Sequence, residues 1–190
     1  MKILDIDQFN EKLDIQPVTK ERLKNMQQHR KDVNVGGILW TRDNANTKLA
    51  ADGTPLKKGL EYVVFDNDYY YTAEAAMKIV PKGWSLPSSE DFKRIIKAQS
   101  IFKFHLADLI STEHGGTNAI PFGAKLIGYV EVLHSAWKNN DHRAHFITSD
   151  ERDENGYYKA FVLSEHEMTF KRIKSNTACS VRFVRDLFDK

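Results

Sequence analysis

Cysteine is almost absent from this sequence of 190 residues, since Cys179 is the only one. A single cysteine excludes a disulfide within the chain and a zinc cluster built from several thiolates. This scarcity is typical of proteins that work in a reducing compartment or that need no covalent cross-link. We therefore expect a fold held by packing and hydrogen bonds, with Cys179 packed in or beside a strand.

Long apolar runs are absent as well. Spanning a bilayer takes about 20 consecutive apolar residues, and no segment approaches that length. Asp5 and Asp7 interrupt the short apolar start, so we expect neither a signal peptide nor insertion into a membrane. The expectation is a protein that acts where it is made, or in a particle that is assembled there.

Charge of one sign is not in excess. The 28 Lys and Arg residues are nearly balanced by 26 Asp and Glu residues, which leaves a net charge of +2. This balance does not favour nucleic acid as a partner. The hydrophobic share of 41% and the 21 aromatic residues supply one core and exclude intrinsic disorder. One domain with an appendage is the natural expectation at this length.

Residues 1–34 contain no glycine and no tryptophan and are rich in charge. Asp7 is a candidate N-cap for a short helix, and Pro17 is expected to end that helix. Residues 18–29 then have a helical pattern whose apolar stripe is too thin to anchor a helix in a large core. Two interpretations stay open: a packed N-terminal helix, or an arm that docks on another protein. The candidate anchor residues of such an arm are apolar: Ile3, Ile6, Phe9, Leu13, Val18 and Leu23.

From Gly36 onward the pattern favours an α+β domain. Strands are expected at residues 38–40 and 61–65, and a helix at 73–79 with Thr72 as its N-cap. A second helix is expected after Ser88 or Ser89, with Phe92, Ile95 and Ile96 on one face. The second half is expected to be β, at residues 124–133, 143–149, 157–164 and 180–184. Helices segregated from strands indicate a mostly antiparallel sheet.

Residue types that carry chemistry do not form a recognisable site. His142 and His145 are three residues apart, a spacing that brings ligands together on a helix but not in a strand or loop. No Ser/His/Asp spacing and no phosphate-binding glycine loop is present. We expect no metal, no cofactor and no enzymatic activity.

Several motifs are more specific. Residues 81–87, Pro-Lys-Gly-Trp-Ser-Leu-Pro, resemble the "CPkGWhLPt" signature of the Fibrobacter succinogenes major paralogous domain. Residues 180–186, Ser-Val-Arg-Phe-Val-Arg-Asp, resemble its closing "SVRCVkd". Three other segments resemble the family pattern more loosely. Residues 37–40, followed by Asn44, and residues 71–76 precede the first motif, and residues 118–123 lie between the two motifs. The resemblance runs from about Val35 to Asp186.

The resemblance implies a C-type lectin-like fold, with two helices, a small twisted and mainly antiparallel sheet, and long loops on one side. It agrees with the α+β interpretation of the residues. We therefore predict an N-terminal docking arm at residues 1–34 and a C-type lectin-like domain at residues 35–190.

The chain departs from the family pattern at two positions. Family members commonly carry cysteines where this sequence has Val80 and Phe183. If the family pair is a disulfide, both positions have become apolar together, and we predict that the two side chains lie close in the core. Trp40, Trp84 and Pro87 are interpreted as structural residues of the domain.

A ligand surface is the remaining candidate site. Calcium-dependent lectins bind sugar through a Glu-Pro-Asn or Gln-Pro-Asp loop, because calcium needs several oxygen ligands. Neither motif occurs here, so calcium-dependent sugar binding is not expected. Trp137 lies in a polar stretch with Asn139 and Asn140, which suits contact with a sugar or a protein.

Two functions stay open. The first is a structural and display protein of a tailed-phage virion, with residues 1–34 attached to a capsid or tail scaffold protein. The opening residues also resemble N-terminal segments of gut Bacteroidetes phage proteins. This function implies a homo-oligomer with a host-surface glycan or protein as candidate ligand. The alternative is a bacterial protein- or glycan-interaction domain in the cytoplasm and outside any virion.

Overall fold

Antiparallel strands make up most of the regular secondary structure of the described residues. The computed structural model describes residues 32–132, 136–138 and 142–187. The strands in chain order are β1 (Asp32–Val35), β2 (Ile38–Thr41), β3 (Tyr62–Phe65), β4 (Asp68–Thr72), β5 (Tyr129–Glu131), β6 (Ala136–Lys138), β7 (Ala144–Ile147), β8 (Tyr158–Leu163), β9 (Met168–Ile173), β10 (Thr177–Cys179) and β11 (Val184–Asp186). The helices are α3 (Ala73–Lys78) and α4 (Ser89–Phe102), with 3₁₀ turns at Leu106–Leu109 and Thr112–His114.

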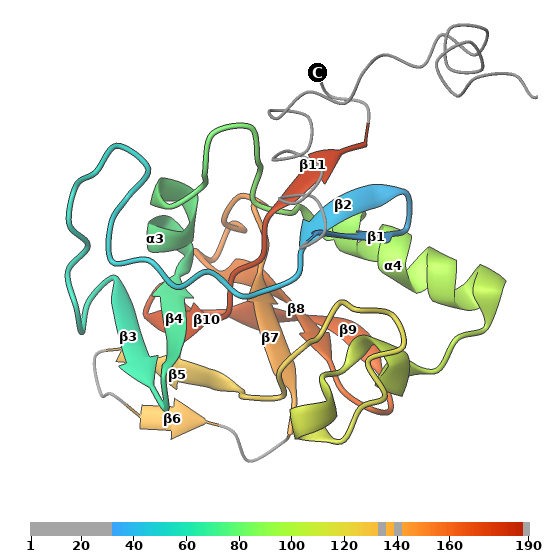
Figure 1. Ribbon diagram of the computed structural model, residues 1–190. Helices are drawn as coiled ribbons and strands as arrows, with labels where there is room; N and C mark the ends of the chain where they lie inside the picture. The colour runs from blue at the N-terminus through green and yellow to red at the C-terminus, as the bar shows by residue number, and fades with distance from the viewer. Residues whose placement is uncertain (1–31, 133–135, 139–141, 188–190) are drawn as a thin grey trace, which may run out of the picture. The chain divides into compact units, whose positions relative to one another are not determined.

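The strands form three sheets (Figure 1). Their orders are β1-β2-β11, β3-β4-β10-β5-β6 and β7-β8-β9, and every pairing of named strands is antiparallel. The prediction of an α+β, C-type lectin-like domain with two helices and one small sheet is therefore wrong. The described residues contain eleven strands in three sheets, and α3 has only six residues.

Three strands account for most of this error. β4 follows a tight turn whose Asp66 and Asn67 have positive φ, and the sequence pattern showed only the turn and the helix cap. In β9 the alternation of Met168 and Phe170 breaks at Arg172, so the apolar pattern is too short to indicate a strand, although Met168, Phe170 and Ile173 all contact the core. β1 includes residues 32–34, which had been assigned to the arm, and Val33 pairs with Trp40 of β2.

Local signals at the helix starts are confirmed. Thr72 accepts a hydrogen bond from the Ala75 amide at the start of α3. Ser88 and Asp91 cap α4 reciprocally, because each side chain accepts from the other residue's backbone amide. Such caps depend on residues three apart, which is why the sequence alone predicts them.

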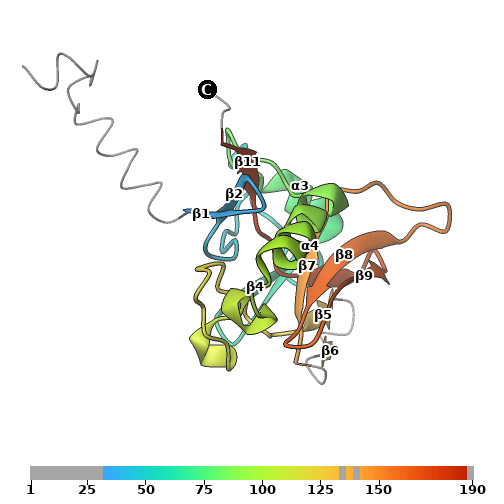
Figure 2. The ribbon, with the colours of Figure 1, turned by 90° about the vertical axis from the view of Figure 1, so that its right-hand side faces the viewer.

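Two of the three clusters of buried side chains in the described part of the chain are rich in aromatic residues. In the first, the Trp40 ring centroid lies 4.9 Å from that of Phe92, and the Phe92 and Phe161 centroids are 4.4 Å apart. The second lies under α3 and contains Tyr71 and Cys179. Figure 2 shows α4 beside β1 and β8, which it contacts.

The segment from β10 to β11 touches all three sheets. β10 belongs to the five-stranded sheet and β11 to the sheet with β1 and β2. Between them, Ser180 exchanges backbone hydrogen bonds with β7, at 3.0 Å from its amide to His145 O and 3.1 Å from the Ile147 amide to its carbonyl. A continuous strand had been expected at residues 180–184. The structure instead has a crossing segment, because its backbone pairs with different partners in turn.

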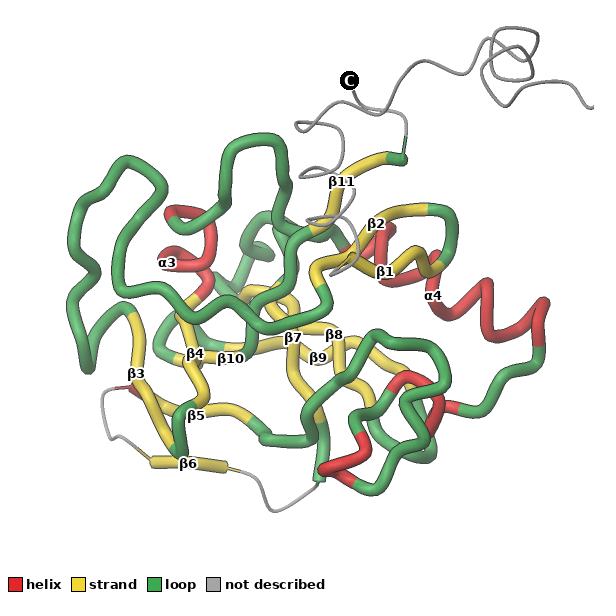
Figure 3. The backbone as a smooth tube through the Cα atoms, viewed as in Figure 1, coloured by secondary structure: helices red, strands yellow, loops and turns green. Residues whose placement is uncertain are grey.

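Arg182 lies in this crossing segment and is almost completely buried, with 1% of its surface exposed. Its guanidinium donates to the carbonyls of Thr41, Arg42, Phe122 and Gly123, and to Asn44 Oδ1 at 2.6 Å. Thr41 ends β2, and the other acceptors belong to the two long loops that Figure 3 shows between β2 and β3 and between α4 and β5. One side chain thus holds both loops against the segment that joins the sheets.

The charge on Arg182 persists despite its burial. Burial lowers the pKa of Arg182 to about 9, and Asp43 opposes this effect, so the guanidinium is charged at neutral pH. The rings of Phe122 and Phe146 also lie near it, at 5.0 and 5.7 Å from the guanidinium carbon.

Replacement of Arg182 by methionine tests this arrangement. Arg182→Met removes the donors and leaves buried acceptors without partners, so we expect the free energy of unfolding to fall by about 3–5 kcal/mol. Urea denaturation measures this change. The control is Arg172→Met, at an exposed arginine whose ion pair with Asp153 contributes about 0–1 kcal/mol. Equal losses in the two variants would contradict the role of Arg182.

Candidate functional site

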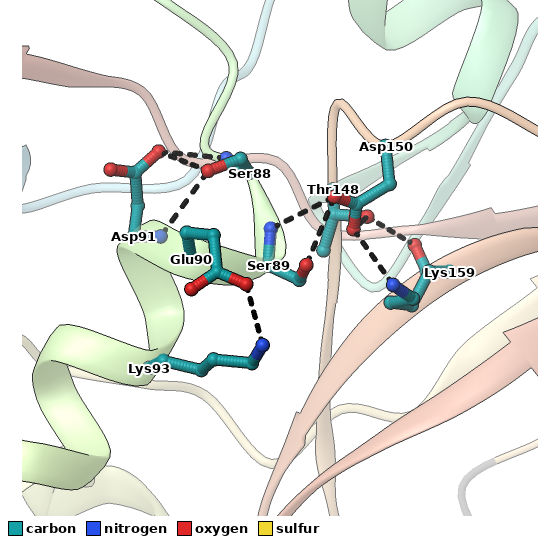
Figure 4. A network of polar contacts seen from close by, with 8 residues as sticks. All are labelled: Ser88, Ser89, Glu90, Asp91, Lys93, Thr148, Asp150 and Lys159. Atoms are coloured by element: carbon teal, nitrogen blue, oxygen red, sulfur yellow. Dashed lines mark hydrogen bonds and ion pairs between the residues drawn. The ribbon is translucent and has the colours of Figure 1, made fainter.

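The first half of α4 is fixed to the rest of the domain by a polar network (Figure 4). Asp150, in the loop after β7, accepts hydrogen bonds from the backbone amide and hydroxyl of Ser89, at 3.3 and 3.0 Å. Thr148 Oγ1 lies 2.8 Å from the same carboxylate, and Lys159 Nζ lies 3.6 Å from it. Phe92 and Ile95 on the next turns are buried in the core.

The last turn of α4 breaks the pattern of the rest of the helix. Phe102 follows Ile95 and Ala98 at the spacing of three and four residues that continues one helix face. Ile95 and Ala98 are buried, yet Phe102 is 75% exposed and its neighbour Ile101 is 60% exposed. These are the two most exposed large apolar side chains among the residues that the structure describes.

These side chains border an apolar groove of about 940 Å³. One wall is the turn between β1 and β2, and the other is α4 from Arg94 to Phe102. Phe104 and Ile120 complete the apolar lining, and both also pack against the first core cluster. We call this surface the α4 groove.

A glycine brings the two walls together. Gly36 has a φ of +68°, and a Cβ atom at this position would lie 2.8 Å from the backbone of Arg94. Only glycine allows this approach, because both the positive φ and the missing side chain are needed. The turn is thereby held against α4.

The charged residues that line the α4 groove are all cationic. They are Arg94 and Lys97, and no Asp or Glu takes part in the lining. The nearest ion pair is a long one, with Arg94 Nη1 3.9 Å from Asp186 Oδ1. The groove therefore combines an apolar floor with a positive rim.

The residues interpreted as structural lie in the core clusters or pack against them. Trp40 is fully buried and donates from Nε1 to the Val35 carbonyl at 3.1 Å. Phe183 is buried in the second core cluster, and Val80 and Trp84 pack against the same cluster. The Arg185 guanidinium carbon lies 4.9 Å from the Trp84 ring centroid.

Pro87 and Cys179 are buried as well. The Pro87 carbonyl accepts from the Ser149 amide at 2.8 Å, so the proline segment is joined to the end of β7. Cys179 lies in β10, as expected, and burial raises the pKa of its thiol. A thiol in this state is a poor nucleophile.

The predicted ligand surface is only partly described. Trp137 belongs to β6, where it pairs with Val130 of β5. Asn139 and Asn140 lie outside the described residues. So do the candidate anchors Ile3, Ile6, Phe9, Leu13, Val18 and Leu23.

Titratable side chains gather in a second hollow of about 670 Å³ around the turn between β8 and β9. Its charged and imidazole groups include His142, Arg143, Glu165, His166 and Glu167, and Arg143 pairs with Glu167 at 3.2 Å. Across the described ranges, no three His, Cys, Asp or Glu side chains are arranged to hold a metal ion. Among residues 32–132, 136–138 and 142–187, no helix is long and apolar enough to cross a bilayer.

The α4 groove was missed by the sequence analysis, which identified only Phe92, Ile95 and Ile96 as the apolar face of this helix. The signal that was available is the apolar pair Ile101 and Phe102 at the C-terminal end of the helix, directly before Lys103. Only the structure shows that the core does not extend as far as Ile101 and Phe102.

Comparison with known proteins gives one match. Residues 33–185 match the family model of the Fibrobacter succinogenes major domain. This is the family that the motifs at residues 81–87 and 180–186 indicated. No curated protein and no solved structure shows significant similarity to the chain.

The link between Asp150 and α4 predicts a pH dependence. Burial acts to raise the pKa of Asp150, but hydrogen bonds from Thr148 and Ser89 outweigh it and lower this pKa below its usual value of 3.8. The carboxylate therefore stabilises the fold at neutral pH, and this contribution is lost as the pH falls below about 4. We expect Asp150→Asn to lose about 1 kcal/mol at pH 7 and to approach the wild type near pH 2–3.

Urea denaturation across this pH range measures the difference. Glu151→Gln, at the exposed neighbouring position, is the control and should follow the wild type throughout. A gap between wild type and Asp150→Asn that is the same at pH 7 and pH 3 would contradict the assignment.

Proposed function

The chain belongs to the Fibrobacter succinogenes major domain family, and we propose that it acts as a non-enzymatic interaction protein. The observation that carries this proposal is the α4 groove, where the apolar face of a helix continues beyond the core. Contiguous apolar surface of this kind marks sites of protein–protein contact on soluble domains. In this proposal the domain is a rigid head, and the groove is the surface that it presents.

The chemistry of the described residues supports a non-enzymatic role. The groove is lined by apolar side chains and two cations, which do not form an acid–base pair. Three groups with displaced pKa values lie outside the groove and serve the fold, since Asp150 holds α4 while Arg182 and Cys179 are buried in the core.

The second part of the proposal concerns attachment. We propose that residues 1–34 attach the head, as an oligomer, to a capsid or tail scaffold protein of a tailed-phage virion. The support is the composition of this segment, which spaces single apolar residues along a charged sequence, and its resemblance to N-terminal segments of gut phage proteins. Such a segment buries little apolar surface by itself, but it buries more when it binds to a partner. The alternative is a bacterial interaction protein of the cytoplasm that uses the same groove.

Substitutions within the N-terminal segment test the attachment. Particles are produced from the phage genome that carries the gene, after deletion of that gene, so that they lack the protein. Purified full-length protein is then mixed with these particles, and the fraction that sediments with them in a density gradient is measured. We expect Ile6→Asp combined with Phe9→Asp to reduce attachment at least about tenfold, because two apolar contacts are lost. The matched control is Gln8→Asp with Asn10→Asp, which adds the same charge at polar positions and should still attach.

Phe102→Ser should also stay on the particle, because the α4 groove belongs to the head. The virion proposal would be contradicted if the wild-type chain fails to sediment with the particles, or if the Ile6 and Phe9 variant attaches as well as its control. In either case the bacterial alternative is favoured.

A further inference from the structure

The chemistry of the α4 groove restricts what it binds. We propose that the groove binds a segment of another protein that is apolar on one face and acidic beside it. This inference rests on the proposed role as an interaction protein and names the partner of the same site. It is argued from the volume of the groove, the charge of its rim and the position of its exposed side chains.

The volume suits several apolar side chains at once. About 940 Å³ is the size of a site for a large ligand or for one face of a helix. Helices that bind in grooves insert apolar residues spaced by three, four and seven positions. The exposed Ile101 and Phe102 offer such residues a partner surface, and Phe104 and Ile120 extend it.

The rim sets the charge of the partner. Arg94 and Lys97 are three residues apart on α4, so they lie on the same side of the helix. No acidic side chain takes part in the groove lining, and the carboxylate that pairs with Arg94, that of Asp186, lies 3.9 Å away and outside the lining. Asp and Glu residues of a partner would pair with these cations, and a basic segment would be repelled.

A second copy of the chain fits this surface less well. A two-fold contact between two α4 grooves would bring Arg94 and Lys97 of one copy towards the same cations of the other. The repulsion between like charges opposes such a pairing. An anionic membrane matches the charge but not the shape, because the apolar atoms line a hollow between the β1–β2 turn and α4.

The experiment uses the full-length chain and two fluorescent helical peptides of about 16 residues. Both carry the same Leu and Phe positions on one face, but one has Glu and the other Lys on the opposite face. Fluorescence anisotropy measures binding at low and high salt. We expect the acidic peptide to bind, with an affinity that falls as salt is added, and the basic peptide to bind at least about tenfold more weakly.

Variants assign the binding to the groove. Phe102→Ser should weaken binding of the acidic peptide at least about tenfold. Arg94→Glu with Lys97→Glu should reverse the preference, so that the basic peptide binds better. The matched controls are Leu60→Ser, at an apolar residue that is 51% exposed, and Lys58→Glu with Lys82→Glu, at exposed lysines. Neither control should change binding.

The outcomes separate this inference from the proposed function. If the basic peptide binds the wild type as well as the acidic one and Phe102→Ser weakens both, the groove is an interaction site but the acidic partner is wrong. If neither peptide binds at millimolar concentration, both the inference and the groove-based function are contradicted.

Three further results would also overturn the acidic partner. The first is self-association of the chain that Phe102→Ser abolishes, which would make a second copy the occupant. The second is peptide binding only after removal of residues 1–31. The third is binding to phosphatidylserine vesicles that depends on Phe102 when neither peptide binds.

Discussion

The buried guanidinium of Arg182 is the interaction on which the rest of the domain depends. It lies in the short segment that joins β10 of one sheet to β11 of another, next to Ser180, which pairs with β7 of the third. Its donors reach carbonyls near residue 42 and near residue 122, in the two long loops. Burying a charge is costly unless its hydrogen bonds are satisfied, and here the backbone satisfies them. The loops must therefore be in place for the sheets to close.

This arrangement explains how the domain presents a surface without losing order. α4 is capped at Ser88 and held by Asp150, and its first turns are buried with Trp40 and Phe92. Its last turn extends past the core, so that Phe102 is exposed on a helix whose position is already fixed. A preformed apolar surface binds a partner with a smaller loss of conformational entropy than a flexible one. The fold thus supports the interaction function proposed for the α4 groove.

The sequence predicted local features well and long-range pairings poorly. Thr72 and Ser88 were recognisable as helix caps because each acts on an amide three residues away. β9 was not recognisable, because the alternation of Met168 and Phe170 breaks at Arg172, and the strand is defined by its hydrogen bonds to β8. The family motifs located Arg182 within a specific segment but did not show its burial, and the expected lectin-like fold was wrong. Phe102 was not identified as a surface residue, because only tertiary structure shows where the core ends.

Native-state hydrogen exchange tests the central role of Arg182 most directly. The amides of Thr41 and Ala45 donate to the carbonyls of Phe183 and Val181, and the amide of Ala124 donates to that of Leu109. If Arg182 holds both loops in one cooperative unit, these amides exchange only through global unfolding, with the same free energy as the amides of β8. If either loop exchanges with a markedly lower free energy while β8 stays protected, the loops open independently and the account is wrong.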